Sequence, residues 1–185
     1  MPCPEFWTPA NIGEVQRKGV ILIARTTTRG SGGDGIVVVR ETDTLPNAPL
    51  YTRYVRKQAE YRIHVVRDSA ILIQQKRRDS EAEQDADQKL IRNHANGWVF
   101  AVNNVEFKDD KQKDECVAAS IAAVRSLGLD FGACDLVTDR KTGQPYVLEV
   151  NTAPGLESPT LIEAYASAFK SIAGGVNYVR QKPRR

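Results

Sequence analysis

Short apolar segments, separated by polar or glycine-rich stretches, recur along most of the chain. Apolar runs of this length, bounded in this way, indicate β-strands. The expected strands are Gly19–Ala24, Ile36–Val39, Leu50–Val55, Tyr61–Arg67, Ala70–Lys76, Trp98–Val102, Phe131–Thr138 and Pro145–Asn151. Only Asp68 and Ser69 separate the fourth and fifth of these segments, so we expect them to form a hairpin.

Two segments instead have the spacing of helices with one apolar face. In the first, Asp110 to Leu127, we expect Asp110 or Asp114 to cap the start and Gly128 to end the helix. The second begins near Pro159, which suits a first helical turn, and is expected to bury Leu161, Tyr165, Phe169 and Ile172. Strands interspersed with two helices predict an α+β fold with mostly antiparallel sheets.

Four stretches show neither the pattern of a strand nor the spacing of a helix. Residues 1–11 contain three prolines and are expected to form an extended lead-in, anchored by Phe6 and Trp7. Arg56–Glu60 is expected to be a polar bend, and the segment 91–97 a polar turn. The charged segment Asp79–Lys89 fits a loop better than a solvated helix.

The last two expected strands carry the most specific chemistry in the chain. A hairpin symmetric about Thr142 places Asp135 opposite Glu149, and Asn151 falls on the same face. Facing carboxylates repel unless a cation or a shared proton lies between them, and a set of oxygen ligands without histidine suits Mg²⁺. The alternative is a pair of solvated carboxylates on an exposed sheet face.

The glycine-rich segment at 30–35, GSGGDG, lies between two expected strands. A dinucleotide-binding loop needs a helix after it, and a Walker A loop needs Gly-Lys-Ser/Thr, so both are rejected. Its bare backbone N–H groups could instead close over phosphates as a flap. A plain glycine-rich turn is the alternative. A kinase is also excluded, because Asp130-Phe-Gly132 has neither the strand lysine nor the H-R-D and A-P-E motifs around it.

Composition places few limits on function. The chain has 185 residues, enough for one domain or two small lobes, and a net charge of +3 that suits a phosphorylated small molecule as well as weak nucleic-acid contact. Phe and Trp do not interleave with basic residues, which makes nucleic acid a weaker hypothesis. Three cysteines without zinc spacing favour a reducing cytoplasm, and two of them, Cys116 and Cys134, are expected in the core. No apolar run is long enough to span a bilayer, so no membrane role is expected.

Together these motifs resemble the ATP-grasp superfamily of carboxylate–amine ligases, over roughly residues 18 to 170. Within it, the chain looks similar to glutathione synthetases and to the glutamate ligases that extend ribosomal-protein tails. The resemblance implies a small flap lobe at about 12–52 and a large lobe at about 53–180 within one domain. It also implies ATP and two Mg²⁺ ions, which Mn²⁺ could replace, and a ligase that works through an acyl phosphate.

The resemblance also implies roles for individual residues of this sequence. Those expected to contact the nucleotide are Arg25, Ser31, Gly32, Gly33, Gly35, Arg53, Tyr54, Val55 and Glu60. Those expected to neutralise the transferring phosphate and the acyl oxyanion are Arg62, Lys76, Arg92 and Asn93. Each of these basic residues could equally be a surface charge. The expected metal ligands are Asp135, Glu149 and Asn151.

Two departures from the family pattern leave the activity open. The flap has Arg25 where the family usually has a lysine, and plain motif spacing lands on Thr26. The usual N-terminal α/β domain is also expected to be absent, as in minimal phage-encoded relatives, unless a homodimer or a partner chain supplies it. The leading hypothesis is therefore an ATP-dependent ligase that joins a carboxylate to an amine, with a peptide or protein end as a candidate substrate. The alternative is an inactive or accessory ATP-binding module of a larger assembly.

Overall fold

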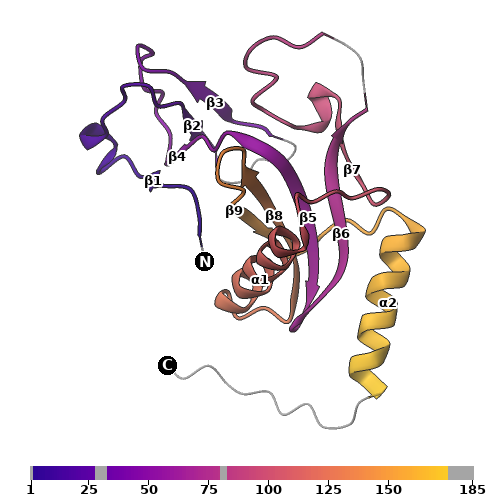
Figure 1. Ribbon diagram of the computed structural model, residues 1–185. Helices are drawn as coiled ribbons and strands as arrows, with labels where there is room; N and C mark the ends of the chain where they lie inside the picture. The colour runs from indigo at the N-terminus through magenta and orange to yellow at the C-terminus, as the bar shows by residue number, and fades with distance from the viewer. Residues whose placement is uncertain (1, 28–32, 80–82, 175–185) are drawn as a thin grey trace, which may run out of the picture.

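The computed structural model of the protein describes residues 2–27, 33–79 and 83–174. These residues form an α+β structure with two antiparallel sheets, as the sequence predicts (Figure 1). The elements of the first part of the chain are β1 (Phe6–Trp7), a 3-10 turn η1 (Ile12–Glu14), β2 (Leu22–Arg25), β3 (Ile36–Val39) and β4 (Leu50–Arg53). The others are β5 (Lys57–Val66), β6 (Ser69–Arg78), η2 (His94–Asn96), β7 (Trp98–Ala101), α1 (Asp110–Ser126), β8 (Phe131–Asp139), β9 (Pro145–Asn151) and α2 (Pro159–Gly174).

The first four strands form a small sheet in the order β1-β4-β2-β3. Its buried side chains are Ile12, Leu22, Ala24, Val39, Ala48 and Tyr51. The other five strands form a larger sheet in the order β7-β6-β5-β8-β9. The chain passes from one sheet to the other through the short segment between β4 and β5, which therefore acts as the connection between two lobes (Figure 1). Whether the lobes divide at the expected residue boundaries stays a prediction.

Side chains alternate across the larger sheet and give it two different faces. Tyr61 and Ile63 of β5 are fully buried and pack in one cluster with Cys116 and Val124 of α1. Their neighbours along the strand point to the opposite face, which is lined by charged and polar groups. Helix α1 thus covers the apolar face, while the start of α2 closes the far end of the polar face, where Leu161 packs with other apolar side chains.

Several expectations were wrong in detail. The segment expected as a polar bend, Arg56–Glu60, mostly belongs to β5, because its polar side chains find partners on the inner face of the sheet instead of in solvent. The lead-in, by contrast, is extended and anchored as expected, since Phe6 and Trp7 form β1, which pairs with β4, and Trp7 packs against the core of the small sheet. Phe169 is 41% exposed, although it contacts the ring of Phe131.

Helix α1 begins at Asp110 as predicted, but its capping residue was predicted wrongly. Asp109 is the N-cap, and its side chain accepts a hydrogen bond from the backbone N–H of Gln112 at 2.7 Å. The end of this helix follows the prediction, since Gly128 has a φ of +68° just beyond it. Cys116 and Cys134 lie in the core as expected. No helix in the described part of the chain is long and apolar enough to cross a membrane.

We expect Asp109→Ala to lower the free energy of unfolding by about 1 kcal/mol, the usual effect of losing an N-cap side chain. The matched control is Asp114→Ala on the exposed side of the same helix, which should change it by less than about 0.5 kcal/mol. Urea titration followed by circular dichroism measures both. Equal losses in the two variants would contradict the assignment of the cap.

Candidate active site in the cleft between the sheets

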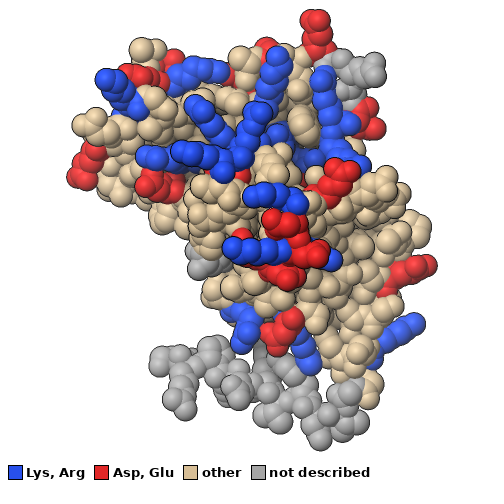
Figure 2. All heavy atoms as spheres, in the orientation of Figure 1, with Lys and Arg blue, Asp and Glu red and all other residues tan. Residues whose placement is uncertain are grey.

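A cleft of about 970 Å³ lies between the small sheet and the polar face of the larger sheet. Strands β2, β3 and β4 line one side, β5 to β9 line the other, and the connection 53–55 closes one end. Figure 2 shows Lys and Arg side chains gathered over the part of the molecule where the two lobes meet. A volume of this size suits a nucleotide or a similar small molecule.

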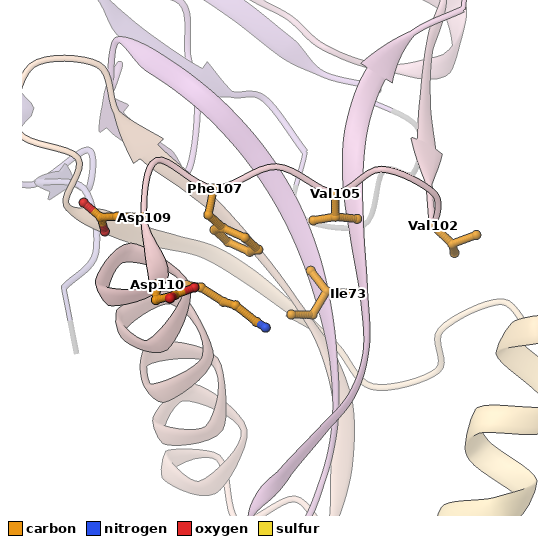
Figure 3. A pocket seen from close by; sticks show the side chains of 7 residues that line it. Ile73, Val102, Val105, Phe107, Asp109 and Asp110 are labelled. Atoms are coloured by element: carbon orange, nitrogen blue, oxygen red, sulfur yellow. The ribbon is translucent and has the colours of Figure 1, made fainter.

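A second cavity, of about 620 Å³, lies on the opposite face of the larger sheet, beside α1. Figure 3 shows Ile73, Val105 and Phe107 along it, with Asp109 and Asp110 at the start of the helix. None of the residues that the sequence singled out for chemistry lines this cavity. The candidate site is therefore the cleft between the lobes.

The cleft brings together most of the residues selected from the sequence. Its lining includes Arg25, Gly33, Arg53, Tyr54, Val55, Glu60, Arg62, Lys76, Arg92, Asn93, Asp135 and Glu149. Gly35 and Asn151 do not line it, and Ser31 and Gly32 lie outside the described residues. The roles given to these residues stay predictions, but their placement on one cavity is a property of the fold.

The carboxylates of the β8–β9 hairpin are neighbours, as the sequence predicts: Asp135 and Glu149 are directly paired residues. On the other side, Asp135 pairs with Arg62 of β5, which donates from Nε to Oδ1 at 2.6 Å and from Nη2 to Oδ2 at 2.7 Å. Glu149 lies 3.7 Å from the guanidinium of Arg25 in the small sheet. Two arginines, one from each lobe, thus neutralise the two carboxylates. The sequence alone had left open what offsets the repulsion between them.

The Asp135 and Glu149 pair fits a hard divalent cation, because its donors are all oxygen and both residues face the cleft. No group of three or more His, Cys, Asp or Glu side chains that could hold a metal occurs among the described residues. Further ligands would therefore be an amide oxygen, water or phosphate. Asn151 could provide the amide, although its Oδ1 here accepts a hydrogen bond from the backbone N–H of Ala153 at 3.1 Å.

Glu60 lies between two lysines on the same face. Its side chain is 6% exposed and accepts hydrogen bonds from Lys76 at 2.7 Å and from Lys57 at 3.1 Å. Burial opposes the charge of Glu60, but the two ammonium groups outweigh it and lower the pKa of the carboxyl. Lys57 was not selected from the sequence, although Glu60 in the same expected bend was. Burial lowers its pKa, Glu60 opposes this, and the charges of Arg92 and Lys76 lower it further.

Aromatic side chains support several of these cations, and the sequence did not identify them as part of the site. The ring of Phe100 lies 4.2 Å from the guanidinium carbon of Arg62 and 4.6 Å from Nζ of Lys76. The guanidinium of Arg92 lies 4.6 Å from the ring centre of Trp98. Both aromatic residues belong to the edge strand β7, for which the sequence predicted only a strand.

Among the described residues of the flap, Gly33 lies against the large lobe. Asn93 caps the turn η2 by accepting a hydrogen bond from the backbone N–H of Asn96 at 3.0 Å. Gly33 packs so closely on its side chain that an added Cβ would lie 2.5 Å from Nδ2 of Asn93. Nearby, Arg40 of the small lobe forms an ion pair with Asp87 of the loop before η2. These contacts hold the flap against the large lobe and close the cleft over its inner wall.

The connection between the lobes is also fixed by hydrogen bonds. The backbone N–H of Arg53 donates to the carbonyl of Glu5 at 2.8 Å, and that of Tyr54 donates to the carbonyl of Ile21 at 2.9 Å. These two N–H groups are therefore used within the small lobe. A base bound at this end would have to meet other backbone groups of the connection, such as those of Val55.

Comparison with known proteins agrees with this geometry. No family model matches the chain. A D-alanine–D-alanine ligase of Polynucleobacter asymbioticus is 30% identical over 178 residues, which cover 89% of this chain and 49% of that protein. The chain thus spans about half the length of this curated relative.

Solved structures give the fold. The D-alanine–D-alanine ligase of Bacillus anthracis matches with a TM-score of 0.63 and 19% identity, over 94% of this chain and 64% of the other. A RiPP-associated ATP-grasp ligase of Chryseobacterium gregarium, in complex with ADP and a leader and core peptide, matches with a TM-score of 0.57 and 16% identity. That match covers 100% of this chain and 58% of the other. The chain has the ATP-grasp fold. Its narrower likeness to glutathione synthetases and ribosomal-protein glutamate ligases stays a prediction.

We expect Glu60→Gln to lower the free energy of unfolding by about 3 kcal/mol at neutral pH, because it leaves two buried ammonium groups without their counter-charge. Glu60 has a lowered pKa in the folded protein, so its stabilising effect is complete above its unfolded pKa, near about 4.3, and is lost as the pH falls through the folded value. The difference between wild type and variant should therefore shrink in acid. Urea titrations at several pH values measure it. The matched control is Glu163→Gln on exposed α2, and an equal loss there would contradict the prediction.

We expect Gly33→Ala to weaken binding of Mg²⁺–ADP about fivefold and to lower the thermal midpoint by about 2 to 4 °C. Gly33 has a φ of +95°, which costs an alanine about 1 kcal/mol, and the new methyl group would push the flap away from Asn93. Isothermal titration calorimetry measures the affinity. Gly13→Ala is the control, since an added Cβ there meets nothing within 4 Å. Unchanged affinity for Gly33→Ala would mean that the flap does not close on a bound nucleotide.

Proposed function

We propose that this chain provides the ATP site of a ligase that joins a carboxylate to an amine and depends on ATP and Mg²⁺. The observation that supports this most directly is the row Glu149, Asp135 and Arg62 on one sheet face, beneath a glycine-containing flap. Oxygen ligands for a cation and a bidentate anion-binding group thus lie side by side. Phosphoryl transfer from ATP needs this combination of positioning and charge neutralisation.

The proposed reaction has two steps. A carboxylate oxygen attacks the γ-phosphorus of ATP, the bond to the β-phosphate oxygen breaks, and ADP leaves. The amine then attacks the carbonyl carbon of the acyl phosphate, loses a proton and releases phosphate. Mg²⁺ supplies neutralisation of the phosphate charge and would be held by Asp135 and Glu149.

The basic residues of the cleft have the properties that these two steps require. Arg62 and Lys76 reach the polar face from adjacent strands, next to the carboxylates. They can stabilise negative charge on the transferring phosphate and on the acyl oxygen. In the structure Arg62 forms an ion pair with Asp135, and Arg25 with Glu149. Binding of a metal–nucleotide complex would exchange these partners, with the cation taking the carboxylates and the phosphates taking the arginines.

The substrates and setting are further parts of the proposal. The Chryseobacterium gregarium relative is described with a leader and core peptide, which supports a peptide or protein end as one substrate class here. A homodimer or a partner chain that completes the substrate site remains a prediction, as do a cytoplasmic location and a phage origin.

The second candidate function is an accessory nucleotide-binding module without ligase activity. It is favoured by Arg25, which replaces the usual flap lysine and lies beside Glu149. Release of ADP, measured with mixtures of amino acids and peptides as carboxylate and amine donors, separates the two. Nucleotide binding without turnover for every mixture would favour the module.

We expect Glu149→Gln to abolish Mg²⁺-dependent ATP turnover, by at least about a hundredfold, because it removes one charge from the cation site. The fold should be unchanged, since the Glu149 side chain is 48% exposed and supports no core packing. ADP release and circular dichroism measure the two effects, with Glu163→Gln as the control. Near-normal turnover in Glu149→Gln would refute the assignment of the site, and chelation of Mg²⁺ should imitate the variant.

A further inference from the structure

The inner wall of the cleft contains two hydrogen-bond donors without acceptors. Nε of Arg92 and Nε1 of Trp98 are both shielded from solvent, and neither meets a partner. Within the described ranges, no other buried side-chain nitrogen or oxygen atom is in this state. Leaving a buried donor unpaired costs about 1 to 3 kcal/mol, so such atoms in a native protein need an explanation.

The two donors belong to side chains in direct contact. The guanidinium carbon of Arg92 lies 4.6 Å from the centre of the Trp98 indole, and both residues line the cleft. Stacking of this kind holds an arginine in place through its flat face. The Nε–H group of Arg92 has no acceptor in this arrangement and stays available for one.

Arg92 is also the cation of the cleft that has no carboxylate. Ion pairs engage the other cations that line it, with Glu149 for Arg25, Glu5 for Arg53, Glu60 for Lys57 and Lys76, and Asp135 for Arg62. No ion pair to Arg92 is found among the described residues. This part of the cleft therefore has an excess positive charge, which attracts an anion more strongly than it would in bulk water.

We propose that Trp98 adds a second donor to the oxyanion site already expected of Arg92, so that the two side chains together form a binding corner for a phosphate or a carboxylate group. The nature of this ligand rests on the proposed function. The ligand would supply the negative charge that Arg92 lacks and an acceptor oxygen for each of the two N–H groups. A neutral amide could satisfy the donors but not the charge. Trp98 thereby gains a role in ligand recognition, in addition to its packing against Arg92. The corner shares its cleft with the proposed ligase site, but its binding requires no turnover.

The test is Trp98→Phe, which keeps an aromatic face beneath Arg92 and removes only the indole N–H donor. Binding of inorganic phosphate, Mg²⁺–ADP and acetate is measured by titration calorimetry. We expect about tenfold weaker binding of at least one probe, the effect of losing one hydrogen bond to a charged group. The matched control is Trp7→Phe in β1, whose side chain does not line the cleft. It should bind every probe as the wild type does.

The probes also identify the source of the oxyanion. Weakened binding of phosphate and ADP but not acetate assigns the corner to the nucleotide, whereas weakened binding of acetate alone assigns it to a carboxylate substrate. Equal affinities in Trp98→Phe and wild type overturn the proposal, and so does a wild type that binds none of the probes.

A second measurement covers the case in which Trp98→Phe is poorly folded. The chain has two tryptophans, so Trp98 is the sole one left in the Trp7→Phe protein. Its emission should shift to longer wavelength when a bound oxyanion accepts the indole N–H. Probe binding without such a shift overturns the proposal. A shift without turnover on any substrate would support the binding corner and refute only the ligase function.

Discussion

The charge balance on the polar face of the larger sheet is the constraint on which the rest of the site depends. Taking charged groups out of water is costly unless each finds a partner with good geometry. The antiparallel register solves this by placing Arg62 next to Asp135, and Asp135 next to Glu149. Lys76 and Lys57 meet Glu60 in the same way. The strands can therefore carry these groups on the inside of a cleft without unfolding it.

This balance also explains how the cleft could admit a metal and a nucleotide. In the structure the carboxylates already face cations, and the arginines already face carboxylates. A metal–nucleotide complex would give each carboxylate another cation as its partner and each arginine another anion. The small lobe takes part through Arg25, which reaches Glu149, and through Gly33, which contacts Asn93. Opening the two lobes would break these contacts, so lobe motion and ligand exchange are physically linked in the proposed mechanism.

Errors in the sequence prediction occurred where tertiary contacts override local preference. Lys57 and Glu60 look like a solvated bend, because a strand built from charged residues is recognised only when its partners across the sheet are known. Trp98 and Phe100 look like core residues of a strand, because nothing local shows that cations lie on their rings. Asp109 was passed over as the cap in favour of Asp110 or Asp114, since neighbouring aspartates cannot be told apart by residue type.

The sequence by itself determined the α+β class, most strands, both helices and the pairing of Asp135 with Glu149, because these follow from short-range periods and from the symmetry of one hairpin. It also selected most of the residues that line the cleft. Only the tertiary structure decided which charges neutralise one another, since Arg25 and Glu149 are far apart in sequence and belong to different sheets. The same is true of Arg92, which has no carboxylate partner in the part of the chain that the structure describes, because this depends on the positions of all the other charges around it.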